Sequence, residues 1–260
     1  NIQRYLEENM LKKYKDKIGK VVSGNITYID KLENTYIEIG EVKGILPRKN
    51  RIKGEKFKVG DVIKAVVKSV NIDKAKGLLV EISRTTPKFL EALLVMEVPE
   101  LKDEKVTIEA SARIPGERAK IALSTTEGNI DPIGAVVGVK GVRINAVSSQ
   151  LKGENIDCVE YSAVPEIFIS RALSPAIVKS VQYTKAGNHD EKAKAVVTIT
   201  ADQKSKAIGK NGLNIRLASM LTKTDIEIVE IGGVSVSENG GENTPQEKTK
   251  DVASLEALFK

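Results

Sequence analysis

The chain has 260 residues, of which 41% are hydrophobic and 29% charged, and its formal net charge is +6. This hydrophobic content indicates a globular protein, and the length gives room for roughly two or three domains. Cys158 is the one cysteine, which excludes a disulfide within the chain, and no apolar run reaches the roughly 18 residues of a membrane span. The surroundings of Cys158 favour a buried, reduced thiol. We therefore expect a cytoplasmic protein without membrane contact.

The first residues form a charged helical pattern. Ile2, Leu6, Met10 and Tyr14 follow one another at intervals of four, which places them on one helix face. The chain does not begin with Met and enters this pattern at once. We therefore expect a fragment of a longer protein, in which residues 1–15 are the last helix of a missing N-terminal domain.

Between residues 16 and 86 the pattern changes to short β segments separated by Gly and charged turns. The strands are expected at residues 20–29, 35–39, 42–46, 62–72 and 78–83. Five strands in about 70 residues predict a small closed barrel. The segment holds 15 Lys and Arg against 9 Asp and Glu, an excess equal to the net charge of the whole chain. Positive charge concentrated in this way favours a nucleic acid as the partner.

A dense basic loop follows the third expected strand. Residues 48–58 contain six basic residues and one acidic residue. A loop of this kind can follow the phosphates of an RNA, and each contact then adds salt-dependent affinity through counterion release. We expect Arg48, Lys49, Arg51 and Lys53 to make these contacts. The alternative is a solvated loop without a ligand.

After residue 86 the chain repeats one order of elements: a helix, two strands, two helices and a strand. The first copy is expected to have helices at residues 87–96, 132–137 and 142–151 and strands at 106–114, 118–124 and 156–161. The second is expected to have helices at 165–173, 203–208 and 213–221 and strands at 178–184, 193–200 and 225–231. This αββααβ order predicts two tandem α+β domains, 87–162 and 163–232, in a multidomain chain.

In both copies a four-residue loop bounded by glycines joins the last two helices. The loops are Gly138-Val139-Lys140-Gly141 and Gly209-Lys210-Asn211-Gly212, which begin 71 residues apart. Glycine has no side chain to obstruct a sugar-phosphate chain, and the helix after the loop presents free amides at its positive dipole end. The alternative is a plain helix cap, which needs only one glycine. The repeated loop predicts binding of single-stranded RNA.

Side chains in and around these loops complete the predicted RNA site. Lys140 and Lys210 can pair with phosphate oxygens, and Arg143 and Arg216 stand on the helices that follow. Apolar side chains would floor a groove for the bases. The other residues predicted to bind RNA are Ile133, Val139, Ile208, Asn211, Asn214 and the four loop glycines, Gly138, Gly141, Gly209 and Gly212.

The two units are joined by only three residues, 162–164. A linker this short does not let the domains swing freely. If the two grooves are fixed in line, one RNA strand can run through both, and the second site then binds at a high effective concentration.

Two modules resemble known families. The segments 19–24, 44–47, 60–65 and 79–84 resemble the OB-fold RNA-binding module named after ribosomal protein S-one, which implies that Tyr36 stacks on a base and that Arg84 closes the same face. The αββααβ order with its loop between the last two helices is similar to that of type II KH domains. The chain is therefore identified as a five-stranded OB-fold barrel followed by two tandem type II KH domains.

Two longer passages, residues 129–141 and 207–218, resemble the NusA family of bacterial transcription factors. The resemblance covers about residues 1–232. It implies a factor that associates with RNA polymerase, mainly through the missing N-terminal domain, and binds the nascent transcript. Its role would be to modulate pausing, termination and antitermination, in company with other transcription factors.

Two other classes of protein use the same modules. An enzyme would need a catalytic constellation, but the one histidine, His189, lies in an expected turn and the acidic residues are scattered. We therefore expect no catalytic residue, no metal and no cofactor. A ribosome-associated or RNA-chaperone protein is the stronger alternative. We expect a monomer, and a flexible tail at 233–260 whose apolar residues near the end could dock on a partner.

Overall fold

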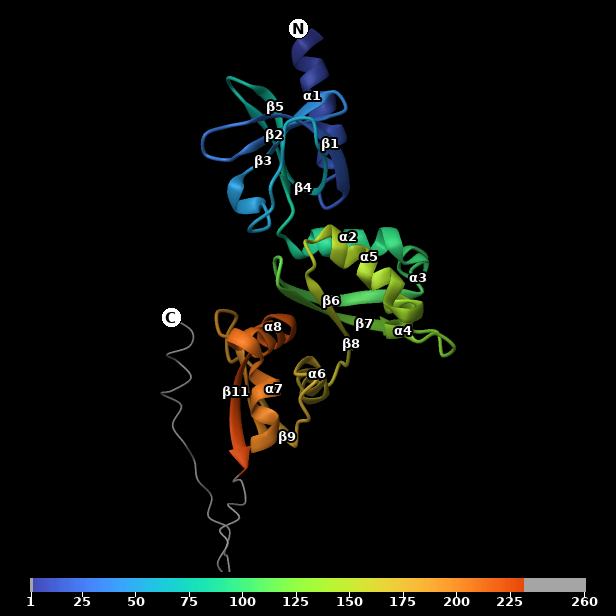
Figure 1. The fold of residues 1–260 in the computed structure, drawn as a ribbon, viewed down its shortest axis with the longest axis vertical. Helices are drawn as coiled ribbons and strands as arrows, with labels where there is room; N and C mark the ends of the chain where they lie inside the picture. Colours follow the sequence, from blue (N-terminus) through green and yellow to red (C-terminus); the bar gives the residue numbers. More distant parts are fainter. Residues whose placement is uncertain (1, 232–260) are drawn as a thin grey trace, which may run out of the picture.

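The computed structural model describes residues 2–231, and the predicted tail at 233–260 lies outside them. The described chain forms three lobes stacked along the long axis of the molecule (Figure 1). The first lobe holds a barrel, and the second and third each hold a three-stranded sheet with helices. In this part of the chain no helix is both long and apolar enough to cross a membrane.

Five strands close into the predicted barrel, in the order β1-β2-β3-β5-β4. Their bounds are β1 (Val21–Ile29), β2 (Thr35–Ile39), β3 (Val42–Leu46), β4 (Val62–Asp73) and β5 (Gly77–Ser83), each within one residue of the prediction. Side chains alternate between the interior and the surface, as the two-residue period of a strand requires. A short 3-10 helix, η1 (Arg48–Asn50), follows β3.

The predicted first helix is present as α1 (Ile2–Lys15) and packs against the barrel. Tyr14 is buried there, and its hydroxyl donates to the carbonyl oxygen of Ile39 at 3.0 Å. Burial, with the charge of Glu41 as a smaller cause, raises the pKa of Tyr14. Ile2 and Leu6, at the other end of the same helix face, are exposed. Only the C-terminal half of α1 is therefore held by the barrel.

The second lobe has the predicted αββααβ order, with a four-residue helix in addition. Its sheet has the order β6-β7-β8, in which β6 and β7 are antiparallel and β7 and β8 are parallel. The elements are α2 (Pro87–Glu97), α3 (Pro99–Lys102), β6 (Val106–Ile114), β7 (Arg118–Thr125), α4 (Pro132–Val137), η2 (Val139–Gly141), α5 (Val142–Gln150) and β8 (Asn155–Glu160).

The third lobe repeats this order. Its sheet has the order β11-β10-β9, with β10 parallel to β11 and antiparallel to β9. The elements are α6 (Pro165–Ala172), β9 (Ser180–Thr184), β10 (Ala193–Thr200), η3 (Ala201–Gln203), α7 (Lys204–Ile208), η4 (Lys210–Gly212), α8 (Leu213–Thr222) and β11 (Thr224–Ile231). The predicted fold class, a barrel followed by two tandem KH units, is confirmed.

The sheet of the first KH unit is buried on both faces. On one face, Ile121 and Leu123 of β7 join the core beneath α2 and α5. On the other face, Ala122 of the same strand joins a core that contains Phe168 of α6 and Leu217 of α8. A strand that is covered on both faces carries apolar residues at successive positions of its sequence. The two KH units therefore share one hydrophobic core across their junction.

A buried arginine ties the barrel to the first KH unit. The guanidinium of Arg84 pairs with Glu55 at 2.8 Å and donates to the carbonyl oxygens of Gln150, at 2.9 Å, and Lys64. Arg84 is 8% exposed. The structure corrects the expectation that this side chain closes an RNA-binding face, because its donors are occupied inside the junction.

A second buried ion pair lies next to it. Arg113 of β6 and Glu154 are 2.9 Å apart, and both side chains are fully buried. Glu154 also accepts a hydrogen bond from the backbone amide of Gly116, and Arg113 donates to the carbonyl oxygens of Arg84 and Thr86. Burial raises the pKa of Glu154, and the charge of Arg113 opposes that shift. The pair fixes the end of the β6–β7 hairpin against the chain segment that leaves the barrel.

Candidate nucleic-acid interface

The two glycine-bounded loops have almost the same backbone conformation. The first glycines have φ and ψ of 77° and 171° at Gly138 and 75° and 173° at Gly209. The third positions are left-handed, with φ and ψ of 53° and 26° at Lys140 and 56° and 25° at Asn211. Asparagine adopts this region more readily than lysine. The two loops thus present the same arrangement of backbone amides from different sequences.

The first glycine of each loop lies directly against the helix that follows. A Cβ atom added to Gly138 would lie 2.8 Å from Cγ of Arg143, and one added to Gly209 would lie 2.7 Å from Cβ of Asn214. Both glycines also have a positive φ that L side chains rarely adopt. Two independent constraints therefore require glycine at this position.

Arg143 is held within the first KH unit. One guanidinium nitrogen donates to the carbonyl oxygen of Ala135 at 2.6 Å and to a carboxylate oxygen of Glu100 at 2.8 Å. The carbonyl of Ala135 belongs to the last turn of α4, where helical partners are missing. Arg143 thus caps the helix before the loop while its side chain stays 29% exposed, and its contact with RNA stays a prediction.

Asn214 has the same role in the second unit and the same offset from the first glycine. It is 4% exposed, and its side-chain amide donates to the carbonyl oxygens of Lys206 at 3.1 Å and Ala207 at 2.9 Å. These carbonyls end α7, directly before the loop. The side chain is buried beneath the loop, which it supports from within, and its contact with RNA stays a prediction.

The other predicted loop residues lie at the surface. Val139, Lys140, Lys210, Asn211 and Arg216 are exposed. Ile133 and Ile208 are half-buried at the ends of the preceding helices. Each loop carries one lysine, at the third position in the first loop and at the second position in the second loop.

An aromatic pair lies on the surface of the barrel. Tyr36 of β2 is directly opposite Tyr28 of β1, and the ring centroids are 5.7 Å apart with an interplanar angle of 33°. Nζ of Lys76 lies 5.1 Å from the centroid of the Tyr36 ring. Exposed rings beside a cation can stack on bases in any sequence. Sequence reasoning missed Tyr28, although its pairing with Tyr36 across a short turn was a usable signal.

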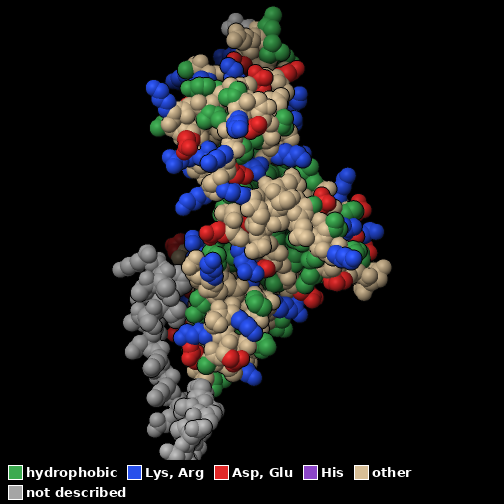
Figure 2. Space-filling view, in the orientation of Figure 1, with side chains coloured by type: hydrophobic (Ala, Val, Ile, Leu, Met, Phe, Trp, Pro, Cys, Tyr) green, Lys and Arg blue, Asp and Glu red, His purple; other side chains and the backbone are tan. Residues whose placement is uncertain are grey.

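The basic loop of the barrel is partly neutralised. Arg48 and Arg51 both pair with Glu33, at 3.0 and 3.4 Å, and the Arg51 side chain is only 16% exposed. Lys49 and Lys53 are exposed. Arg48 and the lysines therefore supply the accessible charge of this loop, while the ion pairs of the two arginines with Glu33 tie it to the β1–β2 turn. Figure 2 shows Lys and Arg side chains over the barrel and the second KH unit, with acidic side chains among them.

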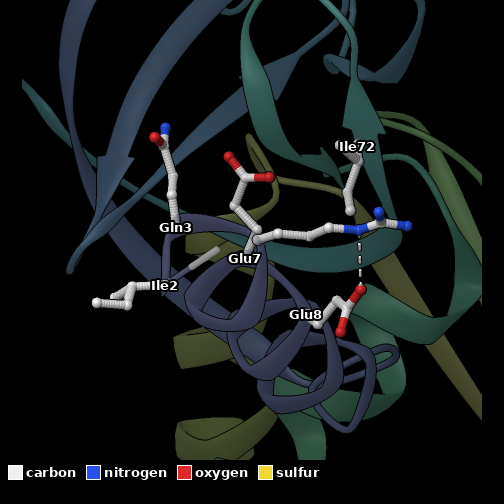
Figure 3. A pocket seen from close by; sticks show the side chains of 6 residues that line it. Ile2, Gln3, Glu7, Glu8 and Ile72 are labelled. Carbon is white, nitrogen blue, oxygen red and sulfur yellow. Dashed lines mark ion pairs between the residues drawn. The ribbon is translucent and has the colours of Figure 1, made fainter.

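Residues 2–231 contain few features that are typical of enzymes. No group of three or more His, Cys, Asp and Glu in this range could hold a metal ion. His189 is exposed in the turn between β9 and β10. A hollow beside α1, lined by Ile2, Gln3, Arg4, Glu7, Glu8 and Ile72, lies at the far end of the molecule from the second KH unit (Figures 1 and 3).

Comparisons with known proteins match the KH region and the chain as a whole. The model of the NusA-like first KH domain matches residues 84–161, and the model of the NusA-like second KH domain matches residues 165–236. A transcription termination/antitermination protein NusA of Helicobacter pylori (strain ATCC 700392 / 26695) is 48% identical, over 100% of this chain and 70% of that protein. The protein of the same name from Thermus thermophilus is 45% identical, over 84% of this chain and 54% of that protein. These matches favour the transcription-factor hypothesis over the ribosome-associated or RNA-chaperone alternative.

Proposed function

We propose, because the chain belongs to the NusA family of transcription termination/antitermination proteins, that it binds nascent single-stranded RNA while associated with RNA polymerase. In this role it modulates pausing, termination and antitermination, together with other transcription factors. It acts in the cytoplasm, as a monomer and without catalytic activity of its own. We further propose that the barrel spans residues 16–86 and the KH domains span 87–162 and 163–232.

The observation that carries the proposal is the pair of loops with one backbone geometry on a shared core. Each loop carries one exposed lysine next to the start of a helix whose dipole favours an anion. Each KH loop holds the backbone of about four nucleotides. Because the units share a core, one strand bound at the first loop is presented to the second at a high effective concentration.

On the barrel, Tyr28 and Tyr36 stack on bases, and Lys49, Lys53 and Lys76 lie near the phosphates. Arg51 contributes less, because it pairs with Glu33 and its side chain is only 16% exposed, whereas that of Arg48 is 69% exposed. The RNA path thus combines two backbone clamps with one stacking surface. This division explains how a chain with 4% aromatic residues can bind a flexible strand.

The test replaces the two loop lysines together. Lys140→Asp with Lys210→Asp is expected to abolish binding of single-stranded RNA, because each aspartate repels the phosphate that the lysine attracted. The circular dichroism spectrum should not change, since both side chains are exposed. A control, Lys185→Asp with Lys192→Asp, changes the net charge equally at exposed sites in the turn between β9 and β10. RNA affinity retained by the loop variant, or lost equally in the control, would count against the two-loop site.

A further inference from the structure

A lysine is buried at the junction of the two KH units. Lys120 of β7 is 0% exposed and lies on the sheet face that packs against the second unit. Its Nζ donates to the carbonyl oxygen of Ser174, just after α6, at 2.9 Å, and Asp157 is its nearest counter-charge at 3.7 Å. A buried ammonium group is costly unless it is paired and hydrogen-bonded. Its partner across the junction is a backbone carbonyl of the other unit.

The neighbouring carbonyl is bound from the second unit. The oxygen of Leu173, one residue before Ser174, accepts a hydrogen bond from the side-chain amide of Asn214 at 3.1 Å. Two adjacent carbonyls at the end of α6 are thus held by two buried polar side chains, Lys120 from the first unit and Asn214 from the second.

Asn214 continues this chain of contacts to the second loop. The same amide donates to the two carbonyls that end α7, and Gly209 lies against its Cβ atom. The loop therefore rests on a side chain whose position depends on the end of α6. The first loop has no such link to the second unit through Arg143, because Arg143 is held by Glu100 and Ala135 of its own unit. These contacts therefore link Lys120 to the second loop and not to the first.

We propose that Lys120 of the first KH unit is a positioning residue for the second loop, through Ser174, Leu173 and Asn214. This proposal rests on the proposed RNA-binding function, and it adds that one KH unit influences RNA binding by the loop of the other. The first unit orders the RNA-binding loop of the second, so the second loop binds RNA fully only when the junction is intact.

The test is made in the whole chain, with one loop disabled at a time. In a Lys140→Asp background, in which only the second loop retains its lysine, Lys120→Met should weaken binding of a single-stranded RNA oligonucleotide about threefold to tenfold, the size of effect expected when one net hydrogen bond is lost. In a Lys210→Asp background, in which only the first loop is intact, Lys120→Met should leave the affinity unchanged. An equal loss in both backgrounds, or no loss in either, would overturn the proposal.

Hydrogen exchange provides a readout that does not depend on RNA. Lys120→Met should speed amide exchange in residues 209–212 and leave residues 138–141 unchanged, so the first loop serves as an internal control in the same molecule. Asn214→Ala should have the same effect, and the double variant should add little, because both replacements break one chain of contacts. If the effects of the two replacements on amide exchange are additive, a single path of contacts from Lys120 to the second loop is contradicted.

These measurements separate the two proposals. If the unaltered protein does not bind RNA, the proposed function fails, while the exchange pattern still decides the role of Lys120. Should Lys120→Met not fold, Lys120→Gln provides the same comparison, because it keeps a polar donor of shorter reach. Uniform exchange in both loops of Lys120→Gln would then overturn the coupling.

Discussion

At the scale of single residues, the first glycine of each loop carries the most specific requirement. We predict that Gly209→Ala lowers the free energy of unfolding by about 1–3 kcal/mol, because alanine must adopt a conformation almost restricted to glycine and its Cβ atom would meet Asn214. Urea unfolding followed by circular dichroism measures the change. Gly128→Ala is the matched control, since nothing lies within 4 Å of a Cβ atom there. If both replacements lower the free energy of unfolding equally, the conformation of Gly209 does not specifically require glycine.

Cys158 provides a second test at this scale. Burial, with the charge of Asp157 as a smaller cause, raises the pKa of its thiol to about 12. Only the thiolate reacts with iodoacetamide, so at pH 8 the folded protein should react more slowly than the unfolded protein by at least about a hundredfold. The rate of the folded protein should keep rising with pH beyond about 9, where that of an ordinary thiol levels off. A plateau near pH 9 in the folded protein would show that the thiol is not shielded.

Three predicted site residues have one feature in common that the sequence did not reveal. Arg84, Arg143 and Asn214 are polar side chains beside predicted binding segments, and backbone carbonyls or carboxylates of other segments accept hydrogen bonds from them. The partner of Arg84 at Gln150 is separated from it by 66 positions. Local sequence does not show such partners, so it cannot distinguish a buried cap from an exposed contact. The role of the loop glycines was easier to predict from the sequence, because the backbone conformation that requires glycine is a local property.

At the scale of elements, strands and helices were predicted more accurately than their contacts. The barrel strands alternate between buried and exposed side chains, and that period marks their bounds in the sequence. The additional helix α3 was missed because four residues are too few to show a helical period. The β7 strand has a signal that was not used. Its short apolar run Ile121-Ala122-Leu123 places apolar side chains on both faces, which favours burial of both and hence a covering unit.

The hairpin of β6 and β7 depends on the buried pair of Arg113 and Glu154. We predict that Glu154→Ala lowers the free energy of unfolding by about 3–5 kcal/mol, because it leaves the Arg113 guanidinium buried without a counter-charge. Chemical denaturation measures this loss. Glu117→Ala, in the exposed turn of the same hairpin, should change stability little. Replacing both partners, as Arg113→Met with Glu154→Leu, should recover much of the loss, and no recovery would mean that the pair acts through more than its charge.

At the scale of the whole molecule, the short linker between the KH units correctly indicated that the two units pack closely against each other. Three residues leave little freedom, and the structure joins the two units through a common core. The sequence could not show that α8 covers the sheet of the first unit, since that contact depends on the orientation of one unit against the other. The barrel is connected differently, through buried arginines and the apolar side chain of Ile52. Three modules that are separate in sequence therefore form one continuous body.

That continuity leads to a prediction about RNA length. The two loops together hold roughly eight nucleotides, so a longer RNA is needed to reach Tyr28 and Tyr36 on the barrel. Tyr28→Ala should weaken binding of a long single-stranded RNA by about 1–3 kcal/mol, the contribution of one stacked base, and should leave binding of a short one unchanged. Titration of both RNAs measures the difference. Tyr5→Ala, which removes an exposed tyrosine from α1 in the same lobe, is the control. If the affinity for the short RNA also falls, Tyr28 acts by stabilising the fold. If the affinity for neither RNA falls, bases do not stack on Tyr28 of the barrel.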